Sequence, residues 1–149
     1  MEKILRIGVV GPKDFPSKRY VFKCLDSLFD TNTIVVPSGT LLEFLLTNMF
    51  GVAQHVMHYA KRKGAHVRIL FPKPNSSIPI EKRLYAVNEK LVELSDYVVL
   101  FKWKTRRAGK HPTQIDKVLS TTSVPTFTFD ILPRHEFFRT VGRRYKYAK

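Results

Sequence analysis

Acidic side chains are scarce in this chain, which carries 12 Asp and Glu against 26 Lys and Arg and has a formal net charge of +14. A surface network of ion pairs needs acids to match its bases, so such a network does not account for these cations. An uncompensated positive charge of this size attracts polyanions, of which nucleic acid is the commonest. The composition therefore favours an anionic partner.

Cysteine is almost missing as well, because Cys24 is the single one, and this excludes an internal disulfide or a cysteine-cluster metal site. Apolar stretches are short and broken by charge, which excludes a membrane span. The first residues lack the apolar run of a signal peptide. With 44% hydrophobic and 12% aromatic residues, the 149-residue chain has a globular composition and the length of about one domain. We expect a cytoplasmic protein without a membrane partner.

Short β-rich runs alternate with helical patterns along most of the chain. The predicted strands are Ile4–Val10, Thr33–Val36, His66–Phe71, Asp96–Phe101 and Val124–Phe129, and the predicted helices are Ser17–Phe29, Thr40–Lys63, Glu81–Leu94 and Pro112–Ser120. Strands joined through helices by short connections form a parallel sheet with helices on both faces. Right-handed crossovers then favour an α/β, Rossmann-like three-layer sandwich with a five-stranded sheet in the order 3-2-1-4-5.

The loop after the fourth predicted strand is the most basic segment of the predicted domain. It contains Lys102, Trp103, Lys104, Arg106, Arg107 and Lys110, and it has no acid before Asp116. Ligands of open α/β sheets bind at the carboxyl ends of the strands. Cations there suit phosphate, and a tryptophan can stack on a base. We therefore expect these side chains to contact a phosphate-bearing ligand.

Two further turns are candidate phosphate sites. Gly11 and Lys13 follow the first strand, where a helix N-terminus favours anions, although any strand-to-helix turn can contain glycine and proline. The segment Ser38, Gly39 and Thr40 follows the second predicted strand and offers amides and hydroxyls. Its simpler interpretation is N-capping of the helix predicted from Thr40, with a secondary ligand role.

Two segments resemble a known group of Rossmann-like proteins. They are the opening strand and turn, Arg6-Ile-Gly-Val-Val-Gly-Pro-Lys-Asp-Phe15, and the run from Val87-Asn88-Glu89 to Asp96-Tyr-Val-Val99. Over roughly residues 4–130 the chain is similar to the SLOG superfamily, which includes the LOG phosphoribohydrolases, the DNA-processing DprA proteins and YpsA-like nucleotide sensors. The resemblance implies a nucleotide-type ligand and places Asn88 and Thr113 at its site.

The same resemblance identifies departures from the enzymes of that group. Their second-strand loop is a Gly-Gly-x-x-Gly type turn, and only Gly39 matches it here; Val87 replaces an arginine. In the run Arg107–Asp116 the glycines of their phosphate cradle are largely replaced. Asp116 is the one acid that stands where their catalytic glutamate would, but stabilisation of the following helix explains it better. We expect no catalytic residue, with Asp116 as the weak candidate.

Other chemistry is poorly supported. His55 and His58 are three residues apart, but no further ligand nearby completes a metal site. No nucleotide-binding loop of the Walker type or catalytic triad is present, so we expect no metal and no cofactor. The sequence predicts one domain over residues 1–130.

Residues 131–149 form a basic, aromatic extension beyond that domain. Cations and aromatic residues are interleaved there as in proteins that bind nucleic acid, with Arg139, Arg143, Arg144 and Lys146 as the candidate contacts. The alternative is a C-terminal helix that packs its aromatic face on the sheet while its cations stay solvated. The two interpretations are compatible.

Taken together, these patterns favour a protein that binds nucleotide or nucleic-acid (DNA or RNA) phosphates in a cationic crevice, without turnover. One alternative is a nucleotide N-glycoside hydrolase that uses Asp116. Another is an interaction protein of phage or viral type that binds an acidic host partner. Self-association also remains open.

Overall fold

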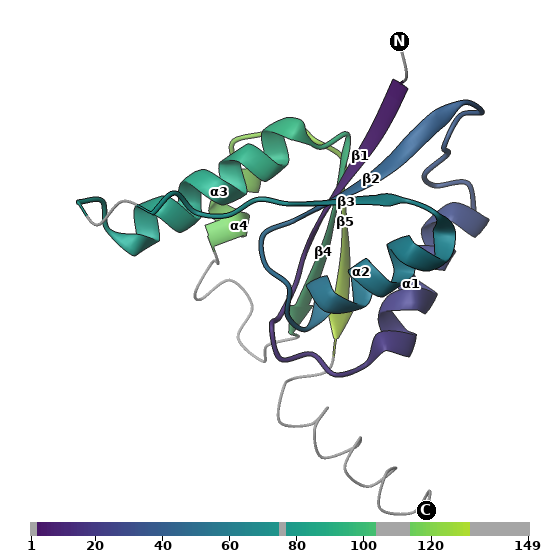
Figure 1. Cartoon of the computed structure of the whole chain (residues 1–149), viewed down its shortest axis with the longest axis horizontal. Helices are drawn as coiled ribbons and strands as arrows, with labels where there is room; N and C mark the ends of the chain where they lie inside the picture. The colour runs from purple at the N-terminus through teal and green to yellow at the C-terminus, as the bar shows by residue number, and fades with distance from the viewer. Residues whose placement is uncertain (1–2, 75–76, 104–113, 132–149) are drawn as a thin grey trace, which may run out of the picture.

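In the computed structural model, which describes residues 3–74, 77–103 and 114–131, the chain forms three layers with a parallel sheet in the middle (Figure 1). The five strands lie in the order β3-β2-β1-β4-β5, and every pair of neighbours is parallel, so the predicted architecture is confirmed. The strands are β1 (Lys3–Val10), β2 (Thr40–Leu46), β3 (His66–Ile69), β4 (Tyr97–Trp103) and β5 (Thr126–Ile131). The helices are α1 (Lys18–Asp30), α2 (Val52–Lys63), α3 (Ile80–Leu94) and α4 (Gln114–Leu119).

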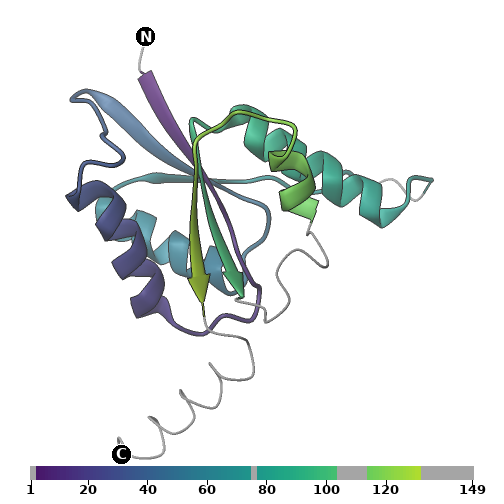
Figure 2. The same cartoon turned by 180° about the vertical axis from the view of Figure 1, so that it is seen from behind.

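The helices divide between the two faces of the sheet. Helices α1 and α2 pack together on one face and α3 and α4 on the other, which Figures 1 and 2 show from opposite sides. Alternate residues of a strand point to opposite faces. Phe44 and Leu46 of β2 accordingly join the core under α1 and α2, whereas Leu45 joins the core under α3 and α4.

The predicted second strand and the predicted start of the second helix are wrong, whereas the helix ends at Lys63 as expected. The structure has no strand at Thr33–Val36, and the segment predicted to begin a long helix at Thr40 is instead β2. Residues Lys3 to Gly8 of β1 pair with Thr40 to Leu45. Because this strand is buried on both faces at its carboxyl half, it lacks the alternation that marks a half-buried strand. The sequence pattern could not distinguish it from a buried helix.

Tyr59 of α2 fills the centre of the core between α1, α2 and the sheet. Its side chain is fully buried, and its ring contacts the rings of Phe22, Phe29 and Phe44. Its hydroxyl donates a 2.7 Å hydrogen bond to Asp26 Oδ1. Burial, followed by the nearby Asp26 carboxylate, raises the pKa of Tyr59 far above its ordinary value, so the hydroxyl remains a donor. This bond fixes α2 against α1.

Candidate functional site

The carboxyl ends of β1 and β4 lie side by side at one edge of the sheet. Val10, the last residue of β1, pairs with Leu100 of β4, and β4 continues to Trp103. The connections from β1 and β2 cover one face of the sheet, and those from β3 and β4 cover the other. The β1–β4 pair is therefore the point where the winding reverses, and open α/β sheets bind their ligands at that point.

The loop after β1 is packed onto the start of α2. The amide of Val52 donates to the carbonyl of Pro12 at 3.1 Å, and His55 Nε2 donates to the carbonyl of Phe15 at 2.8 Å. Gly51, at φ +56°, allows this approach, since a Cβ atom there would lie 2.3 Å from the Pro12 oxygen. The helix-start amide of Val52 is thus taken by protein.

Helix α1 is likewise capped by the protein itself. Ser17 Oγ accepts a 3.2 Å hydrogen bond from the amide of Tyr20, the usual bond of a serine N-cap. Gly11 lies in a tight contact, because a Cβ atom there would be 2.7 Å from Val52 Cγ2. Lys13, by contrast, is exposed on the same loop. Of the two predicted residues in this turn, Gly11 permits close packing and Lys13 is available to a ligand.

His55 gives this packing a dependence on pH. Its Nδ1 atom is buried and has no hydrogen-bond partner among the described residues. Burial lowers the pKa of His55 below its ordinary 6.5; the bond to Phe15 opposes this shift, and the positive charges of His58 and Lys18 reinforce it. The unfolded chain therefore binds a proton at a higher pH than the folded chain.

We expect the stability of the folded protein to fall as the pH drops below about 6.5, where unfolded His55 becomes protonated first. The variant His55→Gln keeps an amide donor for the Phe15 carbonyl but cannot titrate. Its thermal midpoint should decline less than that of the wild type between neutral pH and the onset of carboxylate titration. Parallel pH profiles for the two proteins would exclude this role of His55.

Lys102 and Asp116 form an ion pair across the two ends of the basic segment. Lys102 Nζ lies 2.8 Å from Asp116 Oδ1 and 3.0 Å from Oδ2, and both side chains are partly exposed. The pair holds the carboxyl end of β4 against the first turn of α4. Lys102 is therefore engaged by a carboxylate, and Asp116 has an ammonium group beside it. This arrangement favours a structural role for Asp116.

Trp103 is half-buried at the end of β4. Its ring packs edge to face against Phe15, with the centroids 5.6 Å apart. Phe15 is itself 1% exposed and also contacts the ring of Tyr20. Trp103 thus fastens β4 to the loop after β1, a packing role that the sequence analysis did not foresee.

Ser38, Gly39 and Thr40 lie at the opposite edge of the sheet, so their predicted position after a carboxyl strand end is wrong. They form a turn in which the Thr40 amide donates to the Pro37 carbonyl at 3.0 Å, and Gly39 has φ +80°. This turn leads into β2, and Thr40 is a strand residue rather than a helix cap. These three residues therefore do not lie at the carboxyl ends of the strands, where the sequence analysis placed them.

Asn88 belongs to α3, where its side-chain amide donates to the carbonyl of Leu84 one turn earlier at 3.1 Å. This bond is local to the helix and brings no neighbouring strand end to Asn88. The remaining predicted contacts lie outside the described residues: Lys104, Arg106, Arg107, Lys110, Thr113, Arg139, Arg143, Arg144 and Lys146.

Exposed apolar side chains follow β2 and β3, and the sequence analysis missed them. Met49 and Phe50, in the loop after β2, are 45% and 61% exposed, and Phe71, after β3, is 64% exposed. Exposed aromatic rings at the ligand-binding edge of a sheet offer stacking surfaces for bases. The signal was present as Asn48 and Gly51, which interrupt the supposed long helix around these residues.

Within the described ranges, no three His, Cys, Asp or Glu side chains come together as a metal site would require. Likewise, none of the helices described here has the length and apolar character needed to cross a membrane. Comparisons of the chain with protein-family models, curated proteins and solved structures give no match. The chemistry of the edge itself must therefore indicate the function.

Proposed function

We propose that this protein binds nucleotide or nucleic-acid phosphates at the carboxyl edge of its sheet, without turnover. The pairing of β1 with β4 carries the proposal, because it sets the Lys13 loop beside the strand that leads into the most basic segment of the domain. Lys102 and Asp116, which stand at the two ends of that segment in the sequence, form an ion pair. Exposed Phe50 and Phe71 add rings on which bases can stack.

Binding without catalysis is supported by the same contacts. The Pro12 carbonyl takes the Val52 amide, and Lys102 engages the only acid that could serve as the hydrolase carboxylate. In the SLOG resemblance the loop after the second strand is rich in glycine, whereas residues 47–51, which follow β2 here, hold one glycine. A backbone cradle for a sugar phosphate needs more exposed amides than this loop supplies.

The cellular setting proposed with this function is the cytoplasm. The Cys24 thiol is buried, and burial raises its pKa, so it is an unreactive core side chain. A single free cysteine, with no disulfide, fits a reducing compartment.

Lys13 tests the edge. We expect Lys13→Gln to weaken binding of a short single-stranded oligonucleotide by about 1 kcal/mol, roughly fivefold, because an exposed charge-assisted contact is lost. Lys3→Gln is the matched control, because Lys3 is exposed at the opposite edge of the sheet and its substitution removes the same charge. Fluorescence anisotropy at fixed salt measures both. Equal losses in the two variants would remove the edge as the site.

A further inference from the structure

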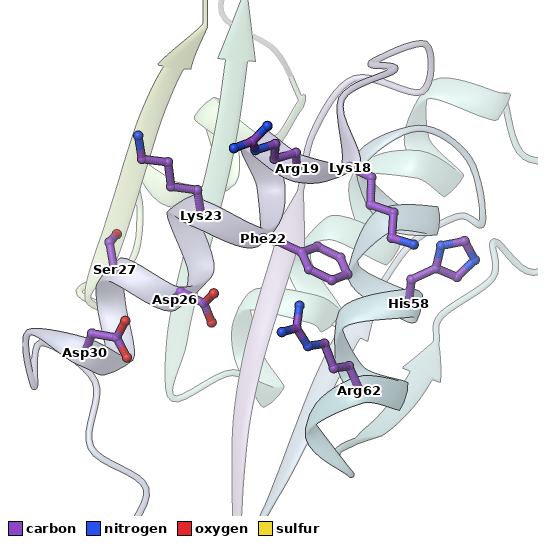
Figure 3. A pocket seen from close by; sticks show the side chains of 9 residues that line it. All are labelled: Lys18, Arg19, Phe22, Lys23, Asp26, Ser27, Asp30, His58 and Arg62. Atoms are coloured by element: carbon purple, nitrogen blue, oxygen red, sulfur yellow. The ribbon is translucent and has the colours of Figure 1, made fainter.

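A groove of about 910 Å³ lies on the outer surface of α1, with α2 along one side (Figure 3). Helix α1 starts from the loop that follows β1, so the groove begins near the carboxyl edge and leads away from it. Its cationic and aromatic lining consists of Lys18, Arg19, Phe22, Lys23, His58 and Arg62. The two helices thus form a basic groove separate from the loops of the edge.

Two cations of the groove each lie close to the ring of Phe22. Lys18 Nζ is 5.5 Å and Arg62 Cζ 6.0 Å from the centroid of Phe22. Each cation is attracted to the face of the ring. The ion pairs formed between described residues are Arg6–Glu43, Lys63–Asp26 and Lys102–Asp116, so no described carboxylate forms an ion pair with Lys18 or Arg62.

The charges along α1 oppose its helix dipole at both ends. Lys18 and Arg19 occupy the first turn, which contains no acid, and Asp30 is the last residue. Cations at a helix N-terminus and an anion at its C-terminus are both unfavourable. An anion bound over the first turn would be attracted both by Lys18 and Arg19 and by the helix dipole, and this attraction offsets the cost.

The acids of the groove limit where such an anion can lie. Asp26 accepts the Tyr59 hydroxyl at 2.7 Å and has Lys63 Nζ at 3.5 Å, so its charge is largely satisfied. Asp30 stands at the far end of α1. The uncompensated positive charge is therefore concentrated in the first turns of α1 and at Arg62.

We propose that this groove holds the phosphate backbone of a single-stranded nucleic acid that extends from the carboxyl edge. The inference rests on the proposed function and deepens it, because a second phosphate-binding surface makes a polynucleotide, and not a mononucleotide, the ligand. Lys18 and Arg62 contact one part of the backbone while the edge holds the preceding nucleotides. A backbone phosphate in the groove would neutralise Lys18 and Arg62, which form no ion pair with a described carboxylate.

The test compares labelled single-stranded oligonucleotides of about 6 and about 20 nucleotides, one near the lower end of the range of single-domain sites and one longer than that range. The double variant Lys18→Gln/Arg62→Gln should bind the long strand about tenfold more weakly. The slope of the logarithm of the binding constant against the logarithm of the salt concentration should become shallower by about 1.4, because two phosphate contacts are lost. Its affinity for the short strand should change less than twofold. Lys82→Gln/Lys90→Gln, on α3, removes the same charge from the opposite layer and should leave both affinities near wild type.

Asp30→Lys provides a gain-of-function variant, since a cation at the end of α1 also suits the helix dipole. It should bind the long strand more tightly, and circular dichroism verifies that every variant is folded. Equal affinities of wild-type protein for short and long strands, with the short strand still sensitive to Lys13→Gln, would overturn the inference alone. Failure of wild type to bind either strand would overturn the proposed function as well. If Lys18→Gln/Arg62→Gln lost binding to an acidic polypeptide but bound DNA and RNA strands as well as wild type does, the groove would belong to a protein partner and the inference would be overturned.

Discussion

Replacing Gly51 by alanine is expected to destabilise the fold by about 2 to 5 kcal/mol. Gly51 has φ +56° and ψ −123°, a conformation that side-chain-bearing residues strongly disfavour. The added Cβ would also lie 2.3 Å from the Pro12 oxygen and 2.4 Å from the Lys13 carbonyl carbon. The loop after β1 must then move away from α2, which breaks the Val52–Pro12 hydrogen bond. Chemical denaturation measures the loss of stability.

Gly64 supplies the matched control for Gly51→Ala. It also has a positive φ, +70°, but nothing lies within 4 Å of a Cβ built there. Gly64→Ala should therefore cost only the left-handed backbone penalty, about 1 to 2 kcal/mol. The difference between the two variants measures the contact of Gly51 with the Pro12–Lys13 backbone. Equal costs would show that the loop after β1 does not depend on this close approach.

Replacing Arg106 and Arg107 together by alanine is expected to lower affinity for single-stranded nucleic acid by about 1 to 3 kcal/mol. This corresponds to roughly fivefold to 150-fold weaker binding. Both arginines belong to the basic segment of the sequence between Lys102 and Asp116, whose side chains form a 2.8 Å ion pair. Contacts to phosphate release counterions, so the salt dependence of binding should fall as well. Anisotropy titrations over a range of salt concentrations measure both effects.

The lysine variants of the same positions separate charge from geometry. Arg106→Lys/Arg107→Lys keeps the charge but removes the planar donor pair, so an intermediate affinity indicates bidentate phosphate contacts. The α3 variant Lys82→Gln/Lys90→Gln controls for net charge. An alanine double variant that binds as well as wild type at physiological salt would place the ligand away from this segment.

The sequence alone determined the architecture and the electrostatic character of this protein. Alternating strand and helix patterns, together with the right-handed crossover rule, leave few arrangements of a parallel sheet, and the observed strand order agrees with the expected one. The net positive charge, from 26 Lys and Arg against 12 Asp and Glu, follows from the composition and does not depend on the fold. These properties are local or additive, so they are visible in the chain itself.

Tertiary structure decided where β2 lies and what the candidate side chains do. Thr40–Leu46 is a strand because it pairs with β1, and this pairing joins residues far apart in sequence. The engagement of Lys102 by Asp116 and of Trp103 by Phe15, and the exposure of Phe50 and Phe71, likewise depend on which elements meet. Periodicity records which faces are apolar, but not which partner covers them. Only packing determines whether a cation or ring at the edge is free for a ligand or held by its neighbours.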